Sequence, residues 1–154
     1  MMRIRILWVG RTRERCLEEG ISRYLMLLQP LCRVSVVEIR EEKGKDRERS
    51  RAAEAERIVK QTASYILLDE RGKEFSSPGF ARFIQERWQE TLQEKGAVDF
   101  VIGGPFGVAD EIREKATAVI ALSRMTFTHE MVRLILLEQL YRAMTILKGK
   151  EYHH

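Results

Sequence analysis

A chain of 154 residues with 44% apolar residues has the size and composition of one globular domain, spanning residues 1–154, which excludes a multidomain enzyme and a disordered chain. No apolar run approaches the ~18–20 residues that cross a bilayer, and the start already carries Arg3 and Arg5, so we expect neither a membrane helix nor a signal peptide. The net charge is +4, and the two cysteines, Cys16 and Cys32, form no Cys-x-x-Cys pair. They support neither a zinc site nor a disulfide scaffold, and a reducing cytoplasm is the expected compartment.

The first third of the chain predicts a strand, a helix and a second strand. Residues 4–9 are short, apolar and β-branched and end at Gly10, which indicates a strand followed by a turn. Apolar residues then fall at helical spacing over 17–28 and stop before Pro30, which predicts a helix. Residues 34–39 are rich in valine and predict the second strand.

The middle of the chain continues this alternation. A segment rich in Ala, Glu and Arg predicts a helix over about 50–62. Residues 65–68 are typical of a strand, and we expect the strand to run into a turn at 69–72. Residues 77–78, Ser-Pro, are typical of a helix start, and the apolar spacing continues that helix to Leu92.

The last third predicts two more strands and a long helix. A strand over 98–102 breaks at the glycine-rich run 103–107, and a helix follows near 109–116. A fifth apolar run over 118–122 predicts the next strand, and the last helix extends from about 129 to 147. Strands that alternate with helices predict an α/β domain with a mostly parallel, doubly wound sheet.

The predicted last helix is apolar on more than one side. Its apolar residues are Met131, Val132, Leu134, Ile135, Leu136, Leu137, Leu140, Tyr141, Met144, Ile146 and Leu147. In so small a domain, such a helix has one face for its own sheet and another for a partner subunit. We therefore expect a homodimer, with Tyr141 and Met144 as candidates for the interface. The alternative is a deeply buried helix in a monomer.

Positive charge is concentrated in the first part of the chain. Residues 1–60 hold 15 Lys+Arg and 10 Asp+Glu, whereas residues 61–154 hold 12 and 13. An RNA-facing surface needs such an excess, because phosphate contacts supply most of the non-specific affinity for nucleic acid. A mixed run such as 41–47 is more often a solvated loop, so the charge pattern leaves both interpretations open.

Three segments follow the predicted strands where open parallel sheets bind ligands, namely 68–72, 103–107 and 122–128. The glycine run would let a ligand approach the backbone closely, but it lacks the fingerprints of dinucleotide and phosphate loops, and a structural turn is an equal alternative. Thr128 could simply cap the next helix. No catalytic triad, metal-ligand spacing or carboxylate pair is apparent. The pattern indicates a small α/β ligand-binding domain.

Four motifs in a fixed order are more specific. They are FVIGGPFG at 100–107, LSRMTFTHEMVR at 122–133, LEQLYRA at 137–143 and the terminal Tyr-His at 152–153. With this spacing they closely resemble the RlmH family, the 23S ribosomal RNA pseudouridine methyltransferases of the SPOUT class, over essentially the whole chain. The resemblance implies a parallel-sheet SPOUT (alpha/beta knot) fold whose C-terminal part threads a deep trefoil knot, an exception to the usual avoidance of knots.

The resemblance also implies a cofactor, S-adenosylmethionine, bound in a bent shape across the loops of the knot. The matching residues here are Leu68, Gly103, Leu122, Ser123, Arg124, Met125, Thr126 and Phe127. Apolar walls and backbone hydrogen-bonding groups suit an adenine, and the glycines at 103 and 104 would remove side chains that block the ligand.

The implied reaction is methyl transfer to N3 of a pseudouridine in the ribosomal RNA of the assembled ribosome, without a metal. The protein must position that nitrogen and help to remove its proton. His153 is the candidate base or orienting group and Tyr152 a stacking surface, while Arg142 and Glu138 could hold the tail or the RNA. His154 departs from the basic residue of the family's tail, and an unperturbed imidazole is mostly uncharged at neutral pH.

Other hypotheses compete with this one. A catalytically silent RNA- or ribosome-binding factor of the same fold would use the basic N-terminal part but would not need the glycine loop or the run 122–127. A small-molecule or nucleotide enzyme of ordinary doubly wound topology is a third hypothesis, and the missing fingerprints argue against it. The terminal Tyr-His-His could also be a frayed end or a tag remnant, and we expect His129, beside a helix cap, to be structural.

Overall fold

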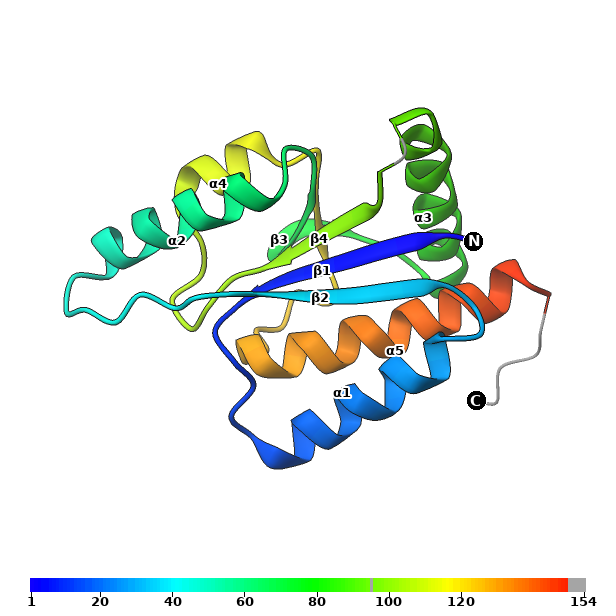
Figure 1. Ribbon diagram of the computed structural model, residues 1–154, viewed down its shortest axis with the longest axis horizontal. Helices are drawn as coiled ribbons and strands as arrows, with labels where there is room; N and C mark the ends of the chain where they lie inside the picture. The colour runs from blue at the N-terminus through cyan, green and yellow to red at the C-terminus, as the bar shows by residue number, and fades with distance from the viewer. Residues whose placement is uncertain (95, 150–154) are drawn as a thin grey trace.

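The computed structural model describes residues 1–94 and 96–149, and within them a five-stranded parallel sheet forms the centre of the molecule (Figure 1). Its strands lie in the order β2-β1-β4-β3-β5. They are β1 (Arg3–Val9), β2 (Arg33–Ile39), β3 (Ile66–Glu74), β4 (Val98–Ile102) and β5 (Ala118–Ala121). The helices are α1 (Arg15–Leu28), α2 (Arg47–Gln61), α3 (Ser77–Thr91), α4 (Asp110–Lys115) and α5 (His129–Leu147), with a 3-10 turn at Leu92–Glu94. The predicted α/β class with a parallel sheet is confirmed.

Helices cover both faces of the sheet. Alternate side chains of β1 show why: Ile4, Ile6 and Trp8 pack into a core with α1, α3 and α5, whereas Leu7 and Val9 pack into a second core with α2 and α4. Figure 1 shows α2 and α4 above the strands and α1 and α5 below them. A strand that is buried on both faces needs apolar residues on both of them, which explains the nearly continuous apolar runs of the sequence.

Side-chain caps begin several helices. The Thr128 hydroxyl accepts a hydrogen bond from the backbone N–H of Met131 (3.2 Å), so the predicted cap of α5 is confirmed. The Asp46 carboxylate accepts hydrogen bonds from two backbone N–H groups of α2, which therefore starts at Arg47, earlier than expected. Arg47, the last residue of the charged run 41–47, thus belongs to the first turn of α2.

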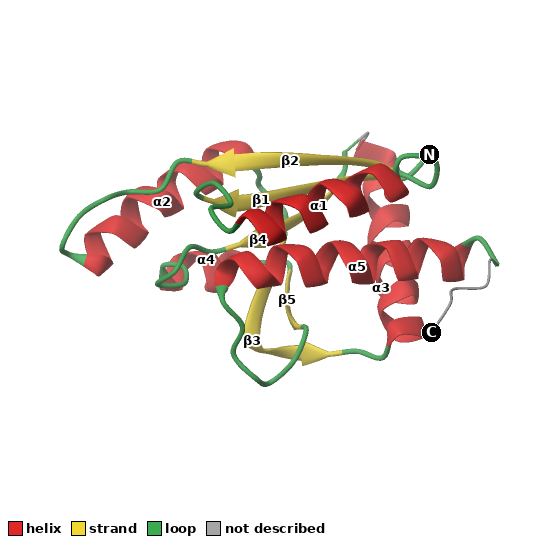
Figure 2. Ribbon diagram, turned by 90° about the horizontal axis from the view of Figure 1, so that it is seen from below, coloured by secondary structure: helices red, strands yellow, loops and turns green. Residues whose placement is uncertain are grey.

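The predicted turn at 69–72 is wrong, because β3 continues through it. The strand bends there (Figure 2), and its pairing with β5 shifts register between Leu68 and Lys73, which both lie opposite Ile120. A Cβ atom on Gly72 would lie 2.6 Å from the backbone nitrogen of Ile120. The polar sequence resembles a turn, but pairing with a distant strand and a glycine at the point of closest approach keep it in the sheet.

The broad apolar surface of α5 is used largely within the chain. The helix lies between α1 and α3, and Leu136, Leu137 and Leu140 have no exposed area. Met144 is only 2% exposed in this core, so the expectation that it faces a partner is wrong. The Tyr141 ring is half-buried and lies 6.2 Å from the ring of Tyr24 on α1. Much of the apolar surface of α5 is therefore buried within the chain, as the alternative of a buried helix predicts. The homodimer stays a prediction.

A membrane helix, a metal site and a disulfide each require features that the described residues do not provide. Across positions 1–94 and 96–149, no helix combines the length and the apolar character required to cross a bilayer. No group of three or more His, Cys, Asp and Glu side chains in this part of the chain could hold a metal ion. Cys16 is exposed and Cys32 is buried, and both are free thiols.

Candidate functional site at the carboxyl ends of the strands

A cavity of about 880 Å³ lies where β4 and β5 end and β3 bends. All three of the predicted loops contribute to its wall, as expected for the carboxyl edge of a parallel sheet. Seven of the eight residues expected to contact the cofactor line it: Leu68, Gly103, Leu122, Ser123, Met125, Thr126 and Phe127. The structure therefore brings these residues together, and their contact with a cofactor stays a prediction.

Arg124 is the residue of that set which does not line the cavity. Its side chain is 89% exposed and forms an ion pair with Glu74 at the end of β3, with 2.9 Å between Nε and Oε1. The expectation that Arg124 contacts the cofactor is therefore not supported by its position. Its guanidinium is directed to the surface, where it remains accessible to solvent.

The glycine loop closes on itself. The Gly107 N–H donates to the Gly104 carbonyl (3.0 Å), and Gly107 has a φ of 78°, a conformation that favours glycine. A Cβ on Gly103 would lie 2.8 Å from the Val108 side chain and 3.0 Å from the carbonyl carbon of Gly107. We expected the absence of a side chain at Gly103 to make room for a ligand. In the structure, that absence also allows residues 107–108 to pack against Gly103.

Two contacts tie the cavity wall to the bent part of β3. The Thr126 hydroxyl donates a hydrogen bond to the Glu70 carboxylate. Asp69 accepts hydrogen bonds from the Arg113 guanidinium of α4 (2.7 Å) and from the backbone N–H of Arg71 (2.9 Å). Desolvation would raise the pKa of Asp69, but the hydrogen bonds from Arg71 and Arg113 outweigh it and lower the pKa to about 2. Asp69 is therefore ionised at neutral pH and fastens β3 to α4.

His129, the first residue of α5, is half-buried and lines the cavity. Burial, together with the nearby Arg133 guanidinium, lowers its pKa below the usual 6.5. The imidazole is therefore neutral at pH 7 and able to accept a proton. We expected a structural role for His129. The sequence could not show that the start of α5 lines the same cavity as the three loops.

Two of the predicted catalytic residues, Glu138 and Arg142, lie away from this cavity. Glu138 and Arg142 form an ion pair on α5 (2.6 Å), and neither lines the cavity. At 1.5 Å per residue, Glu138 lies about 14 Å along the helix axis from His129. Tyr152 and His153 lie outside the described residues.

Arg51 is a cavity residue that the sequence interpretation missed, and it contacts Phe106 of the predicted loop 103–107. An Arg51 Nη atom donates to the Phe106 carbonyl oxygen (3.3 Å), and both residues line the cavity. The sequence did carry a signal, because Arg47 and Arg51 are four residues apart, which is helical spacing, but nothing in it showed that this side of the helix faces the glycine loop.

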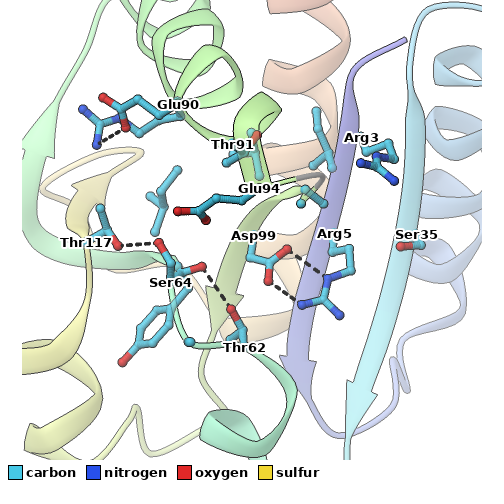
Figure 3. Close-up of a pocket in the computed structure, with 18 of the residues that line it drawn as sticks. Arg3, Arg5, Ser35, Thr62, Ser64, Glu90, Thr91, Glu94, Asp99 and Thr117 are labelled. Carbon is cyan, nitrogen blue, oxygen red and sulfur yellow. Dashed lines mark hydrogen bonds and ion pairs between the residues drawn. The ribbon is translucent and has the colours of Figure 1, made fainter.

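A second cavity, of about 700 Å³, lies at the opposite edge of the sheet, where β1, β2 and β4 begin (Figure 3). Arg5 and Asp99, on neighbouring strands, form a pair of hydrogen bonds there, one of them 2.9 Å from Nε to Oδ1. The Ser64 and Thr117 hydroxyls pair in the same cavity (2.9 Å). Of the residues predicted for the functional site, none that the structure describes lines this second cavity.

Comparisons with known proteins identify the family of the chain. A family model described as "Predicted SPOUT methyltransferase" matches residues 2–153. The chain is similar to proteins named ribosomal RNA large subunit methyltransferase H. It is 48% identical to the one from Geobacter sulfurreducens, over 99% of this chain and 100% of the relative. It is 46% identical to those from Geotalea daltonii, over 99% and 100%, and Geobacter metallireducens, over 99% of each chain. The chain therefore belongs to the SPOUT methyltransferase family.

Proposed function

We propose that the protein is an S-adenosylmethionine-dependent methyltransferase that acts on N3 of a pseudouridine in the 23S ribosomal RNA of the assembled ribosome, in the cytoplasm. One observation carries the proposal: the cavity at the carboxyl edge of the sheet is walled by seven of the eight residues expected from the family motifs. Similarity to proteins named ribosomal RNA large subunit methyltransferases, over the full length of the chain, supports the RNA substrate.

The residues at the cavity fit the cofactor. A volume of about 880 Å³ lies within the roughly 300–1,000 Å³ of small-molecule sites. Leu68, Ile102 and Leu122 offer apolar walls for an adenine, and the backbone of 103–107 offers hydrogen-bonding groups. When bound, the sulfonium would supply an already activated methyl group.

The chain must then orient the target base and take up the proton of its imino nitrogen. His129 is neutral at pH 7 and lines the cavity, which makes it a candidate proton acceptor within the described residues. His153 of the tail is the candidate that the family resemblance implies. We keep Tyr152, Arg142 and Glu138 as residues that could position the base or the tail.

We infer that the C-terminal part of the chain is knotted, as the family resemblance implies. Residues 122–128 pass alongside the bent half of β3 before α5 begins (Figure 2). The contacts from Thr126 to Glu70 and from Arg124 to Glu74 hold the segment there. The close approach of β5 to Gly72 supports the same arrangement.

We also propose a homodimer in which the tail of one subunit reaches the cavity of the other. Exposed apolar side chains on α1 and α5 support an interface on this side of the molecule: Met26 is 60% exposed, and Met131 and Ile146 are each 37% exposed. Such an arrangement would complete the site only in the dimer.

The proposed function is tested by transfer of a tritiated methyl group from S-adenosylmethionine. The substrates are ribosomes, separated subunits and naked ribosomal RNA from cells that lack the enzyme. We expect incorporation into the large-subunit RNA of assembled ribosomes, at a pseudouridine. Binding of the cofactor without any methyl transfer would instead indicate a catalytically silent ribosome-binding factor.

A further inference from the structure

Phe106 is an exposed aromatic residue at the edge of the cavity. It occupies a corner of the tight turn that the hydrogen bond from Gly107 to Gly104 closes. The side chain lines the cavity, yet it remains 48% exposed. Met125 and Phe127 line the same cavity and are 76% and 37% exposed. An aromatic residue that is held rigidly and left half in water is suited to stacking against a partner.

Two arginines of α2 hold this ring in place. Arg47 and Arg51 are four residues apart and therefore lie on one side of the helix. The Arg47 guanidinium carbon lies 4.1 Å from the centroid of the Phe106 ring, and Arg51 donates to the Phe106 carbonyl. Arg47 is itself an exposed residue, so its side chain covers part of the ring and remains accessible to solvent.

The segment around these arginines is strongly basic. Within 43–51 the basic residues are Lys43, Lys45, Arg47, Arg49 and Arg51, and the acidic residues are Asp46 and Glu48. The Asp46 carboxylate caps α2. Just before the segment, Glu41 forms an ion pair with Arg13 and Glu42 with Arg57. The positive charge of the segment is therefore left for a partner.

We propose that Phe106, Arg47 and the basic residues of 43–51 form an RNA-docking surface, on which an unpaired base stacks on the Phe106 ring while the cations contact phosphates beside the target nucleotide. An exposed ring flanked by arginines is the chemistry that binds single-stranded RNA, because every base has a stacking face and every nucleotide a phosphate. A protein partner would need a matching acidic surface but not the ring. The inference rests on the proposed function and adds to it how the substrate is held.

The test compares Arg47→Gln and Phe106→Leu with the wild type. Arg82→Gln is the matched control, because Arg82 is an exposed arginine on α3, across the sheet from α2. The first measurement is the affinity for large ribosomal subunits and for a short single-stranded RNA at several KCl concentrations. We expect about a tenfold loss of affinity for both probes with each variant. For Arg47→Gln the slope of log affinity against log salt should fall by about one.

Further measurements separate docking from folding. S-adenosylmethionine affinity of Arg47→Gln, measured by calorimetry, should stay within about twofold of the wild type. Phe106→Tyr, which keeps the stacking face, should restore RNA affinity. Urea denaturation establishes that each variant is folded before it is compared.

Several outcomes would overturn the surface. Wild-type affinity in both Arg47→Gln and Phe106→Leu would do so, as would an equal loss in Arg82→Gln. Weaker binding to subunits with unchanged binding to the short RNA would point to a ribosomal protein instead. A wild-type protein that binds subunits but transfers no methyl group would contradict the proposed methyltransferase function. The comparison of the variants would then still test whether Phe106 and Arg47 form an RNA-docking surface.

Discussion

Arg133 of α5 donates a hydrogen bond to the backbone carbonyl of Val9 at the end of β1 (2.7 Å), although its side chain has no exposed area. A second bond reaches the Thr12 hydroxyl (2.9 Å), and the guanidinium carbon lies 4.9 Å from the centroid of the Trp8 ring. The neighbouring Glu130 accepts hydrogen bonds from backbone N–H groups of the same loop. The start of α5, which carries His129, is thereby fixed to the loop that follows β1.

Arg133→Met should therefore lower the free energy of unfolding by about 3 kcal/mol, because the carbonyl of Val9 stays buried without its donor. Urea denaturation measures the change. Arg82→Gln, at an exposed position, should stay within about 0.5 kcal/mol of the wild type. If Arg133→Met lost no more than about 0.5 kcal/mol, water would have replaced the guanidinium as the donor to the Val9 carbonyl.

Gly72→Ala should cost more than 2 kcal/mol, since the added Cβ would lie 2.6–2.7 Å from backbone atoms of β5, which cannot rotate away. Gly44→Ala is the matched control, because its Cβ would lie 3.4 Å from the Ser50 hydroxyl, an ordinary contact. Thermal unfolding of both variants distinguishes them. Equal melting temperatures would mean that β3 and β5 can separate at this point.

Asp69 predicts a pH dependence of stability. Its folded pKa of about 2 lies below the 3.8 of an unperturbed aspartate, so it stabilises the fold above pH 3.8, and that contribution is lost as the pH falls toward 2. The difference corresponds to about 2 kcal/mol at neutral pH. Asp69→Asn should therefore be destabilised at pH 7 and nearly equal to the wild type at pH 2. Denaturation curves across this range are the measurement, and a constant difference would contradict it.

His129 and His153 can be separated by the pH dependence of methyl transfer. If His129 accepts the proton, kcat/KM of the wild type should decrease as the pH falls, with a midpoint below pH 6.5, because the pKa of His129 is lowered. His129→Gln should then lose about 100-fold or more in kcat. A larger loss in His153→Gln, with His129→Gln near wild type, would assign the proton to the tail.

The homodimer and the tail give a further prediction. Light scattering at micromolar concentration should show a dimer. Deletion of 152–154 should leave the dimer intact, keep cofactor affinity within a few-fold and reduce methyl transfer by about 100-fold or more. Mixing the truncated chain with a cofactor-loop variant that keeps its tail should restore part of the activity through hybrid dimers. A monomer, or full activity of the truncated chain, would contradict the composite site.

Local sequence patterns predicted those parts of the fold that depend on neighbours along the chain. Strands buried on both faces, the Ser-Pro helix start and the Thr128 cap each carry their own signal, and each was found. The bend of β3 was missed, because Gly72 resembles a turn residue until the backbone of Ile120 is placed beside it. Pairing between distant segments decided the structure there.

The candidate site likewise contains residues that the sequence predicted and contacts that it could not predict. The loop residues that the family motifs indicate line one cavity, except Arg124, whose exposed side chain pairs with Glu74 instead. The contact of Arg47 with Phe106 joins α2 to a loop more than fifty residues later, and no periodicity encodes it. Met144 was misjudged because an apolar position on a helix does not say which neighbour covers it.

The order of the strands has a consequence for how the protein is made. β1 lies in the interior of the sheet, yet one of its two partners is β4, whose Asp99 is 94 residues beyond Arg5. At roughly 5–20 residues per second, β1 waits several seconds for that partner during synthesis. The hydrogen bond from Arg133 to the Val9 carbonyl at the end of β1 can form only later still, because Arg133 is synthesised after β4. An unpaired apolar edge during this interval is a site for aggregation, so the nascent chain should depend on chaperones and fold slowly, as chains with many long-range contacts do.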